Sequence, residues 1–545
     1  MKRLVVVIAI ALLSFFSSLS WGAVEATVTP GAWSLYVGTS KTPGDHASEA
    51  ACVSAAKALG RAAKYTCRTI TGVVVSIVAD PPPVVCPAAS AATSVTMACP
   101  SGTTGTWTQT TTYTMGPPPA CVQSASVNPA QAPDGACTTV VTPPPVSGPV
   151  FYVDASAAND NGAGTATSPK KCIGSGASLL PASGGGTLII KPGTYSQACD
   201  ALTGQGRGAA NAWNTIRAET DGTVRITASF GLPYADHWLR FEGLLWDSPQ
   251  SKGVTGRYVK ILRSAFRGGP ANDNTVTFGI GTNDKTPGAQ YVLLEDVQVF
   301  GPGGRYNVLV YNSDKVVLRR VVARHETGWS DTKGDPQAGV SLYNSTDVLT
   351  QNLVVIDSGA PGYFEAALYH PSNSRASANI RNVGAIVYNT AGSGVGWDDG
   401  AAVTGMVLEH SAVINSAGVG AFVNGGVKQV AMRNVTISGT GSHGVANWSN
   451  GKDVTLVNSK LTSIKGELIK GVVTASGAST GATISKVLGK SGTLWGESGY
   501  DVEQDSSLWP WPQEALVKAR MCAGVTTGLC ASGTLTEYLR GAIGQ

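Results

Sequence analysis

Charge is scarce in this sequence. Asp, Glu, Lys and Arg account for 14% of the 545 residues, and the formal net charge is only +4 at pH 7. This composition excludes a coiled coil and a charge-rich disordered chain. If Lys2 and Arg3 are removed with a leader peptide, the net charge falls to +2. A charge this small gives no reason to expect nucleic-acid binding.

Cysteine motifs typical of metal sites are absent. The chain has 10 cysteines but no Cys-x-x-Cys sequence, and no histidine lies at ligand spacing from a cysteine pair. We therefore expect no metal held by cysteine. An even number of cysteines in an exported chain predicts disulfides, although sequence leaves their connectivity open. We interpret five close pairs as local disulfides: Cys52 with Cys67, Cys86 with Cys99, Cys121 with Cys137, Cys172 with Cys199, and Cys522 with Cys530.

Transmembrane-length apolar segments are also absent. The apolar run from Leu4 to Phe16 follows two basic residues and precedes small residues near Ala23. This is the pattern of a signal peptide at residues 1–23, and the run is too short to span a bilayer. The sequence predicts secretion to the periplasm or beyond, with a retained membrane anchor as the alternative.

Glycine and proline are abundant, with 67 and 29 residues. Proline clusters at 81–83, 117–119 and 143–145 indicate stiff, extended connectors. We predict a small disulfide-stapled module at 24–80, with a helix at 51–59 and strands at 65–78. A Cys-, Pro- and Thr-rich module with linkers follows at 81–148, then a repeat region at 149–495 and a C-terminal cap at 496–545.

The repeat region divides into units of about 24 to 32 residues, a period typical of solenoids. Apolar and polar positions alternate within each unit, as in strands. Stacked, the units predict an inner apolar column of Leu294, Leu318, Thr350, Ile380, Leu408, Met432, Leu456 and Ile484. A polar column holds Asp296, Asn352, Asn382, Asn434 and Asn458. We interpret the polar column as a ladder at a tight turn, where Asn tolerates left-handed geometry.

The start of this region resembles a known superfamily. Phe151-Tyr-Val-Asp154, Gly164-Thr165, Ser168-Pro169 and Gly186-Thr-Leu-Ile-Ile-Lys-Pro-Gly-Thr-Tyr195 resemble the opening coil of pectate-lyase-like, single-stranded right-handed β-helix proteins. The resemblance implies an all-β fold, a right-handed parallel β-helix, and says little about substrate. The segments Cys99–Gln109 and Ala132–Cys137 resemble modules of bacteriophage tail-fibre and spike proteins and of exported bacterial proteins. That likeness implies surface display or attachment.

A second strand in each coil predicts a binding face. Aligned by their leading Val or Ala, these strands give one outward column of Tyr311, Tyr343, Tyr369, Asp398, Phe422 and Trp448. Flat rings suit the apolar faces of sugars, so a polysaccharide lying along this stripe is the functional hypothesis. The alternatives are an aromatic stack that stabilises the solenoid, or a register shift that turns the column inward.

Asp398, Asp399 and His370 are the catalytic candidates. Paired carboxylates beside an imidazole suit general acid–base chemistry, and glycoside hydrolysis uses two carboxylates. Adjacent strand residues point to opposite faces, so Asp398 and Asp399 share a site only if Gly400 marks a turn or bulge. The alternatives are ordinary turn chemistry or a bound cation, with calcium left open.

The turn from Arg324 to Asp335 is a second candidate site. It offers His325 and Trp329 for substrate binding, and Asp331 with Lys333 for lyase chemistry. A solvated turn is the alternative. Taken together, the sequence predicts a secreted protein that binds a polysaccharide or cell-surface glycan, and leaves open cleavage by hydrolase or lyase chemistry. The competing prediction is a non-catalytic adhesin, a glycan-binding spike or a purely structural solenoid.

Overall fold

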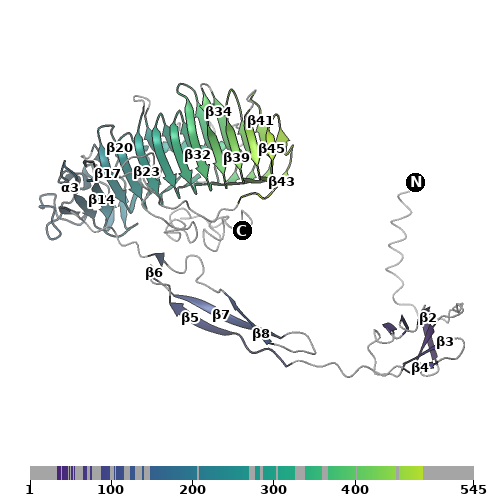
Figure 1. The fold of residues 1–545 in the computed structure, drawn as a ribbon. Coiled ribbons are helices and arrows are strands. Elements are labelled where there is room, and N and C mark those ends of the chain that lie inside the picture. Colours follow the sequence, from purple (N-terminus) through teal and green to yellow (C-terminus); the bar gives the residue numbers. More distant parts are fainter. Residues whose placement is uncertain are drawn as a thin grey trace. The chain divides into compact units, whose positions relative to one another are not determined.

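The fold was examined in a computed structural model of the chain (Figure 1). It describes residues 33–37, 40–46, 48, 51–52, 54–55, 65–69, 74–76, 87–98, 103–104, 106–115, 123–128, 138–139, 148–204, 208–210, 212–268, 276–282, 287–301, 305–325, 338–358, 366–399, 402–449 and 453–482. The chain divides into two compact units, and the solenoid lies in the second. No helix in the described ranges has the length and apolar character needed to cross a membrane.

The N-terminal region contains small antiparallel sheets. A first sheet has the order β2-β1-β3-β4, from β1 (Trp33–Val37), β2 (Ser40–His46), β3 (Tyr65–Thr69) and β4 (Val74–Ser76). Further pairings join β5 (Thr93–Ala98), β7 (Thr106–Met115) and β8 (Gln123–Asn128), and β6 (Thr103–Thr104) with β9 (Thr138–Thr139). The predicted Cys52–Cys67 disulfide is present and ties a short helical segment to β3.

The repeat region folds as the predicted right-handed parallel β-helix. Most coils contribute one strand to each of three parallel sheets, and successive coils stack in register (Figure 1). The first sheet comprises β10 (Val150–Val153), β11 (Thr187–Ile190), β14 (Asn214–Ala218), β17 (His237–Glu242), β20 (Arg257–Leu262), β23 (Gln290–Glu295), β26 (Asp314–Arg319), β29 (Thr346–Gln351), β32 (Ser377–Val383), β35 (Val403–Thr404), β36 (Met406–Glu409), β39 (Val430–Arg433), β42 (Val454–Val457) and β45 (Thr474–Ser476).

The other two sheets follow the same coil order. The second sheet comprises β12 (Gly193–Tyr195), β15 (Val224–Ile226), β18 (Leu244–Asp247), β21 (Ala265–Arg267), β24 (Gln298–Gly301), β27 (Val322–His325), β30 (Val354–Ile356), β33 (Ile386–Thr390), β37 (Ala412–Ser416), β40 (Thr436–Thr440) and β43 (Lys460–Ile464). The third sheet comprises β13 (Leu202–Thr203), β16 (Phe230–Leu232), β19 (Lys252–Val254), β22 (Val276–Gly281), β25 (Tyr306–Tyr311), β28 (Ala338–Tyr343), β31 (Ala366–Ser372), β34 (Ser393–Asp399), β38 (Ala421–Val423), β41 (Val445–Asn447) and β44 (Ile469–Lys470).

The core lies inside the coils, where alternate residues of all three sheets meet. The predicted inner column is confirmed for Leu294, Leu318, Thr350, Leu408, Met432 and Leu456, which pair coil to coil or occupy the same register. It is wrong at Ile380. Asn382, two residues later, lies opposite Thr350 and Leu408. Both Ile380 and Asn382 face inward, so the apolar pattern alone did not distinguish the two registers. Ile484 lies outside the described residues.

The turn between the first and second sheets holds four residues of the predicted polar column, in the left-handed geometry that was expected. Asp296, Asn352, Asn434 and Asn458 all adopt positive φ, between 49° and 56°. Asn is among the few residues that adopt this conformation readily, because its short polar side chain can bond locally. Asn382 does not belong to the ladder. In its coil the turn position is taken by Gly384, with φ of 67°.

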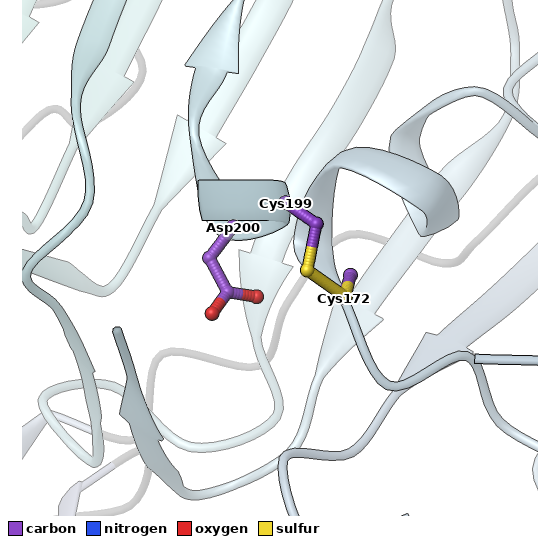
Figure 2. Close-up of side chains that lie close together, drawn as sticks. All are labelled: Cys172, Cys199 and Asp200. Atoms are coloured by element: carbon purple, nitrogen blue, oxygen red, sulfur yellow. A yellow bond between two sulfur atoms is a disulfide. The ribbon is translucent and has the colours of Figure 1, made fainter. Parts of the chain in front are cut away.

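The first coils are fastened by a helix and a disulfide. Helix α3 (Ile173–Ala177) and the short 3₁₀ helix η1 (Ala198–Asp200) are joined by the predicted Cys172–Cys199 disulfide. Figure 2 shows Cys199 and Asp200 on one helical turn, beside Cys172. The remaining three predicted disulfides and the C-terminal cap lie outside the described residues.

Candidate functional site

The third sheet places two tyrosines on its outer face. In β25, Val308 and Val310 point into the core, so Tyr311 points outward. Tyr343 of β28 lies directly opposite Tyr311, with ring centroids 5.1 Å apart and planes at 61°. Both rings are half-buried. Burial raises the pKa of Tyr343, and the neighbouring Tyr311 adds to the effect. The Tyr343 phenol is therefore a neutral donor near pH 7.

Tyr369 belongs to this face but not to the predicted column. Leu368 lies opposite Val340, so Tyr369 lies opposite Ser341 rather than Tyr343. The shift is two residues, and an even shift keeps a side chain on the same face of a sheet. The position opposite Asp398 is Pro371. The prediction was wrong about the neighbour of Tyr369 and right about its face.

Asp398 is held in a defined orientation on the outer face. Its Oδ2 accepts a hydrogen bond from the Tyr369 hydroxyl at 2.8 Å, and its Oδ1 accepts one from Asn424 Nδ2 at 3.0 Å. Tyr369 and Asn424 come from the coils before and after β34, so stacking of three coils fixes the carboxylate. The Asp398 side chain remains partly exposed. A carboxylate accepts more than two hydrogen bonds, so it can still accept from a ligand hydroxyl.

Trp448, which directly follows β41, is the last aromatic residue of the predicted column on the outer face of the third sheet. It is 38% exposed and lies 5.6 Å, centroid to centroid, from the buried Phe422. Phe422 lies opposite Gly396 and Ala446, so it is also displaced from the predicted column. We define the outer stripe as the outward residues of the third sheet that carry aromatic or acidic groups: Tyr311, Tyr343, Tyr369, Asp398, Phe422 and Trp448.

His370 does not lie on the outer stripe, which corrects its predicted place beside Asp399 in the site around Asp398. As the strand neighbour of Tyr369 it faces inward and is fully buried. Its ring stacks on Trp397 with centroids 5.4 Å apart, and its Nε2 accepts a hydrogen bond from Asn382 Nδ2 at 3.0 Å. Burial lowers the pKa of His370 to about 4. A neutral imidazole inside the core cannot reach a polysaccharide, so His370 is not available as the predicted acid or base.

The other predicted residues fall in different places. Asp399 ends β34 opposite Ser372, and its side chain lies outside the described residues. His325 ends β27 in the second sheet, where it is 6% exposed and lies 3.1 Å from Ser358 Oγ through Nδ1. Burial lowers the pKa of His325 to about 4. It is therefore not the exposed binding residue that the sequence predicted. Trp329 lies outside the described residues.

A cleft that the sequence analysis missed adjoins the outer stripe. It has a volume of about 710 Å³ and lies over β13, β16, β19, β22 and β25 of the third sheet. Tyr311 and Leu309 form one wall, and Gly231, Gly253 and Gly279 form the floor. The glycine floor could have been predicted from a repeated sequence pattern. The triplets Phe230-Gly-Leu232, Lys252-Gly-Val254 and Phe278-Gly-Ile280 place glycine at the same strand position in successive coils.

A stack of aromatic rings on the first sheet was also missed. It comprises Trp213, Trp238, Tyr258 and Tyr291. Trp238 and Tyr258 lie 4.1 Å apart and parallel within 4°, and Tyr258 and Tyr291 follow at 4.6 Å. The Lys315 ammonium lies 4.8 Å from the Tyr291 centroid and that of Lys260 lies 4.7 Å from Trp213. The ring faces thus contact one another and two cations, which suits stabilisation of the coils rather than sugar stacking.

Cys172, Cys199 and Asp200 bring three potential metal-ligand atoms together (Figure 2). The two sulfurs form a disulfide, so neither is a thiolate ligand. Asp200 accepts hydrogen bonds from the backbone N–H groups of Ile173 at 3.1 Å and Gln197 at 2.8 Å. These contacts explain the cluster as part of the helix caps, and it does not fit a metal.

Solved structures similar to this chain act on polysaccharides according to their names. Pectate lyase Pel9A is 14% identical, with a TM-score of 0.42, over 62% of this chain and 82% of that chain. The mannuronan C-5 epimerase AlgE6 A-module of Azotobacter vinelandii is 12% identical, with a TM-score of 0.37, over 56% and 94%. The GH87 alpha-1,3-glucanase catalytic unit from Streptomyces thermodiastaticus is 14% identical, with a TM-score of 0.29, over 55% and 66%. No protein-family model and no curated protein matches the sequence.

Proposed function

We propose that this protein binds a polysaccharide along the outer stripe of the third sheet, with the sugar chain crossing successive coils. The observation that supports this most is the continuity of the binding groups. Tyr311 and Tyr343 lie on adjacent strands, and the oriented carboxylate of Asp398 follows two coils later. Strands in a sheet lie about 4.8 Å apart, so these groups repeat along the axis as the units of a polymer do. Tyrosine provides apolar area together with a hydroxyl, the combination that a pyranose ring needs.

Two disulfides support a location in an oxidising compartment. The Cys52–Cys67 and Cys172–Cys199 disulfides are expected to persist only in an oxidising environment. This supports a protein that meets its polysaccharide outside the cytoplasm, in the periplasm or beyond the cell. A polysaccharide-binding adhesin and a polysaccharide-cleaving enzyme both fit that location.

Replacing Tyr343 with alanine is expected to weaken polysaccharide binding by about 5- to 30-fold, the effect of losing roughly 1–2 kcal/mol of ring contact. Binding is measured by affinity electrophoresis against neutral and acidic polysaccharides. Tyr388→Ala is the matched control, because Tyr388 is a half-buried outward tyrosine of the second sheet. Equal affinity of wild type and Tyr343→Ala, or equal losses in both variants, would contradict the proposed face.

The same mixtures distinguish binding from cleavage. New reducing ends without ultraviolet absorbance would indicate hydrolysis, and absorbance from unsaturated sugar ends would indicate a lyase. Activity that is lost in Asp398→Ala while binding survives would make Asp398 a catalytic group. Binding without either product would support the adhesin. Wild-type protein that binds no polysaccharide in the panel would refute the proposed function.

A further inference from the structure

Three glycines occupy equivalent outward positions in successive strands of the third sheet. Gly231 of β16 lies opposite Gly253 of β19, and Gly253 lies opposite Gly279 of β22. Their strand neighbours Leu232, Val254 and Ile280 point into the core, so a side chain at each glycine would point outward. Glycine weakens a strand, because it loses more backbone freedom on folding and contributes no packing. Three in one column therefore require an explanation.

The fold itself does not need glycine at two of these positions, Gly231 and Gly279. None of the three has the positive φ that favours glycine. Of the residues that the structure describes, none lies within 4 Å of a Cβ atom at Gly231, and none lies closer than 3.8 Å to one at Gly279. Gly253 is tighter, with the Gly279 carbonyl oxygen at 3.1 Å. At Gly231 and Gly279 a larger residue would fit the backbone and would project into the cleft.

Among the described residues, most of the groups that line the cleft above these glycines are uncharged. Its walls include Thr203, Pro233, Thr255, Leu309 and Tyr311. Among the described lining residues Lys252 carries a charge, but it is 2% exposed and donates to the carbonyls of Ser248 at 2.6 Å and Gln250 at 2.9 Å. Hydroxyl groups with an apolar wall suit a neutral sugar better than a uronic acid, whose carboxylate would find no exposed cation among the described lining residues.

We infer that the glycine-floored cleft binds an uncharged sugar unit of the polysaccharide, and that Gly231 and Gly279 are present so that the sugar can approach the sheet backbone. This inference rests on the proposed function, because Tyr311 belongs both to the cleft wall and to the outer stripe. A chain lying along the stripe would thus enter the cleft past Tyr311. The cleft would favour neutral sugar units over uronic acids. The aromatic rings of the outer stripe would discriminate less between the two.

The test uses full-length Gly231→Val and Gly279→Val proteins. Valine favours strands, so each variant is expected to unfold at the same or a higher urea concentration than wild type. Its side chain would fill the floor, and affinity for a neutral polysaccharide should fall at least about tenfold. The probes are dextran, xylan and galactomannan, with alginate and polygalacturonate as acidic counterparts. Thr455→Val, at an outward position of the first sheet, is the control and should bind as wild type does.

The outcomes separate this inference from the proposed function. Wild type that binds neutral polysaccharide, with binding weakened in Tyr343→Ala and in both glycine variants, supports both. Weakening in Tyr343→Ala with unchanged binding in two folded glycine variants overturns the cleft and keeps the stripe. Wild type that binds only alginate or polygalacturonate overturns the preference for neutral sugar. A glycine variant that fails to fold is replaced by Gly231→Ala, whose Cβ meets none of the described residues within 4 Å.

Discussion

Replacing Arg320 with asparagine is expected to lower the free energy of unfolding by about 3–5 kcal/mol, the usual cost of removing one partner from a buried ion pair. Arg320 is fully buried and donates to Glu295 Oε1 at 3.0 Å and to Asp296 Oδ1 at 2.5 Å. Both carboxylate residues are 1% exposed. The two acidic groups raise the pKa of Arg320 against the opposing effect of burial. Without the guanidinium, the buried carboxylates of Glu295 and Asp296 both lose the cation that donates to them. Urea unfolding at pH 7, followed by circular dichroism, measures the loss.

Asparagine is chosen because it keeps the backbone unstrained. Arg320 has φ of 49°, and Asn352 and Asn434 adopt φ of 52° at equivalent turns. A variant that combines Arg320→Asn with Glu295→Gln and Asp296→Asn removes both signs of charge and should recover most of the loss. A loss below about 1 kcal/mol in the single variant, as in an exposed pair, would contradict the argument. Failure of the triple variant to recover would assign the loss to packing instead.

Acid is expected to destabilise the solenoid through its two buried histidines, by about 3 kcal/mol each between pH 6.5 and pH 4. Burial lowers the pKa of His325 and of His370 from 6.5 to about 4. The unfolded chain exposes both rings, so it binds more protons than the folded chain within this pH range. Stability from the neutral folded histidines is therefore complete above pH 6.5 and declines as the pH falls towards 4.

The measurement compares wild type with His325→Gln/His370→Gln by urea unfolding at several pH values. Glutamine has an amide that does not titrate, and its oxygen can accept the hydrogen bond that Asn382 donates to His370. The double variant should lose about 6 kcal/mol less than wild type across the same pH range. Identical pH slopes would show that acid sensitivity arises from other groups. The single variants assign the effect to each ring.

The fold could be predicted from the sequence because the patterns that indicate it are local and recur from coil to coil. Alternation of apolar and polar residues determines which side of a strand meets the core, and stacking identical patterns fixes three parallel sheets. The tight turn was predicted from recurring Asn and Asp residues, which tolerate positive φ better than most residues do. They are Asp296, Asn352, Asn434 and Asn458. The pairing of Tyr311 with Tyr343 followed from two strands of the same pattern. The disulfides Cys52–Cys67 and Cys172–Cys199 followed from proximity along the chain.

The register between dissimilar coils was decided only by the tertiary structure. Ala366 and Leu368 are both apolar and both fit the inner face, so the sequence allowed either opposite Val340, and packing selected Leu368. Tyr369 therefore lies two residues away from its predicted register, where its hydroxyl donates a hydrogen bond to Asp398. The predicted register was also two residues off at Ile380, because Asn382 and not Ile380 lies opposite Thr350.

The position of polar groups in the interior also depended on the assembled coils. Neither His370 nor Asn382 has a sequence pattern that marks it as buried. The sequence predicted His370 in the catalytic site and Asn382 in the ladder at the tight turn. Inside the solenoid each satisfies the other, with Asn382 Nδ2 3.0 Å from His370 Nε2 and Thr350 Oγ1 2.9 Å from Asn382 Oδ1. A buried polar group is tolerated when its partner lies on another strand. The sequence by itself determined which residues form strands, sheets and turns, because those depend on near neighbours. Only the tertiary structure decided which side chains meet across coils, because that depends on register.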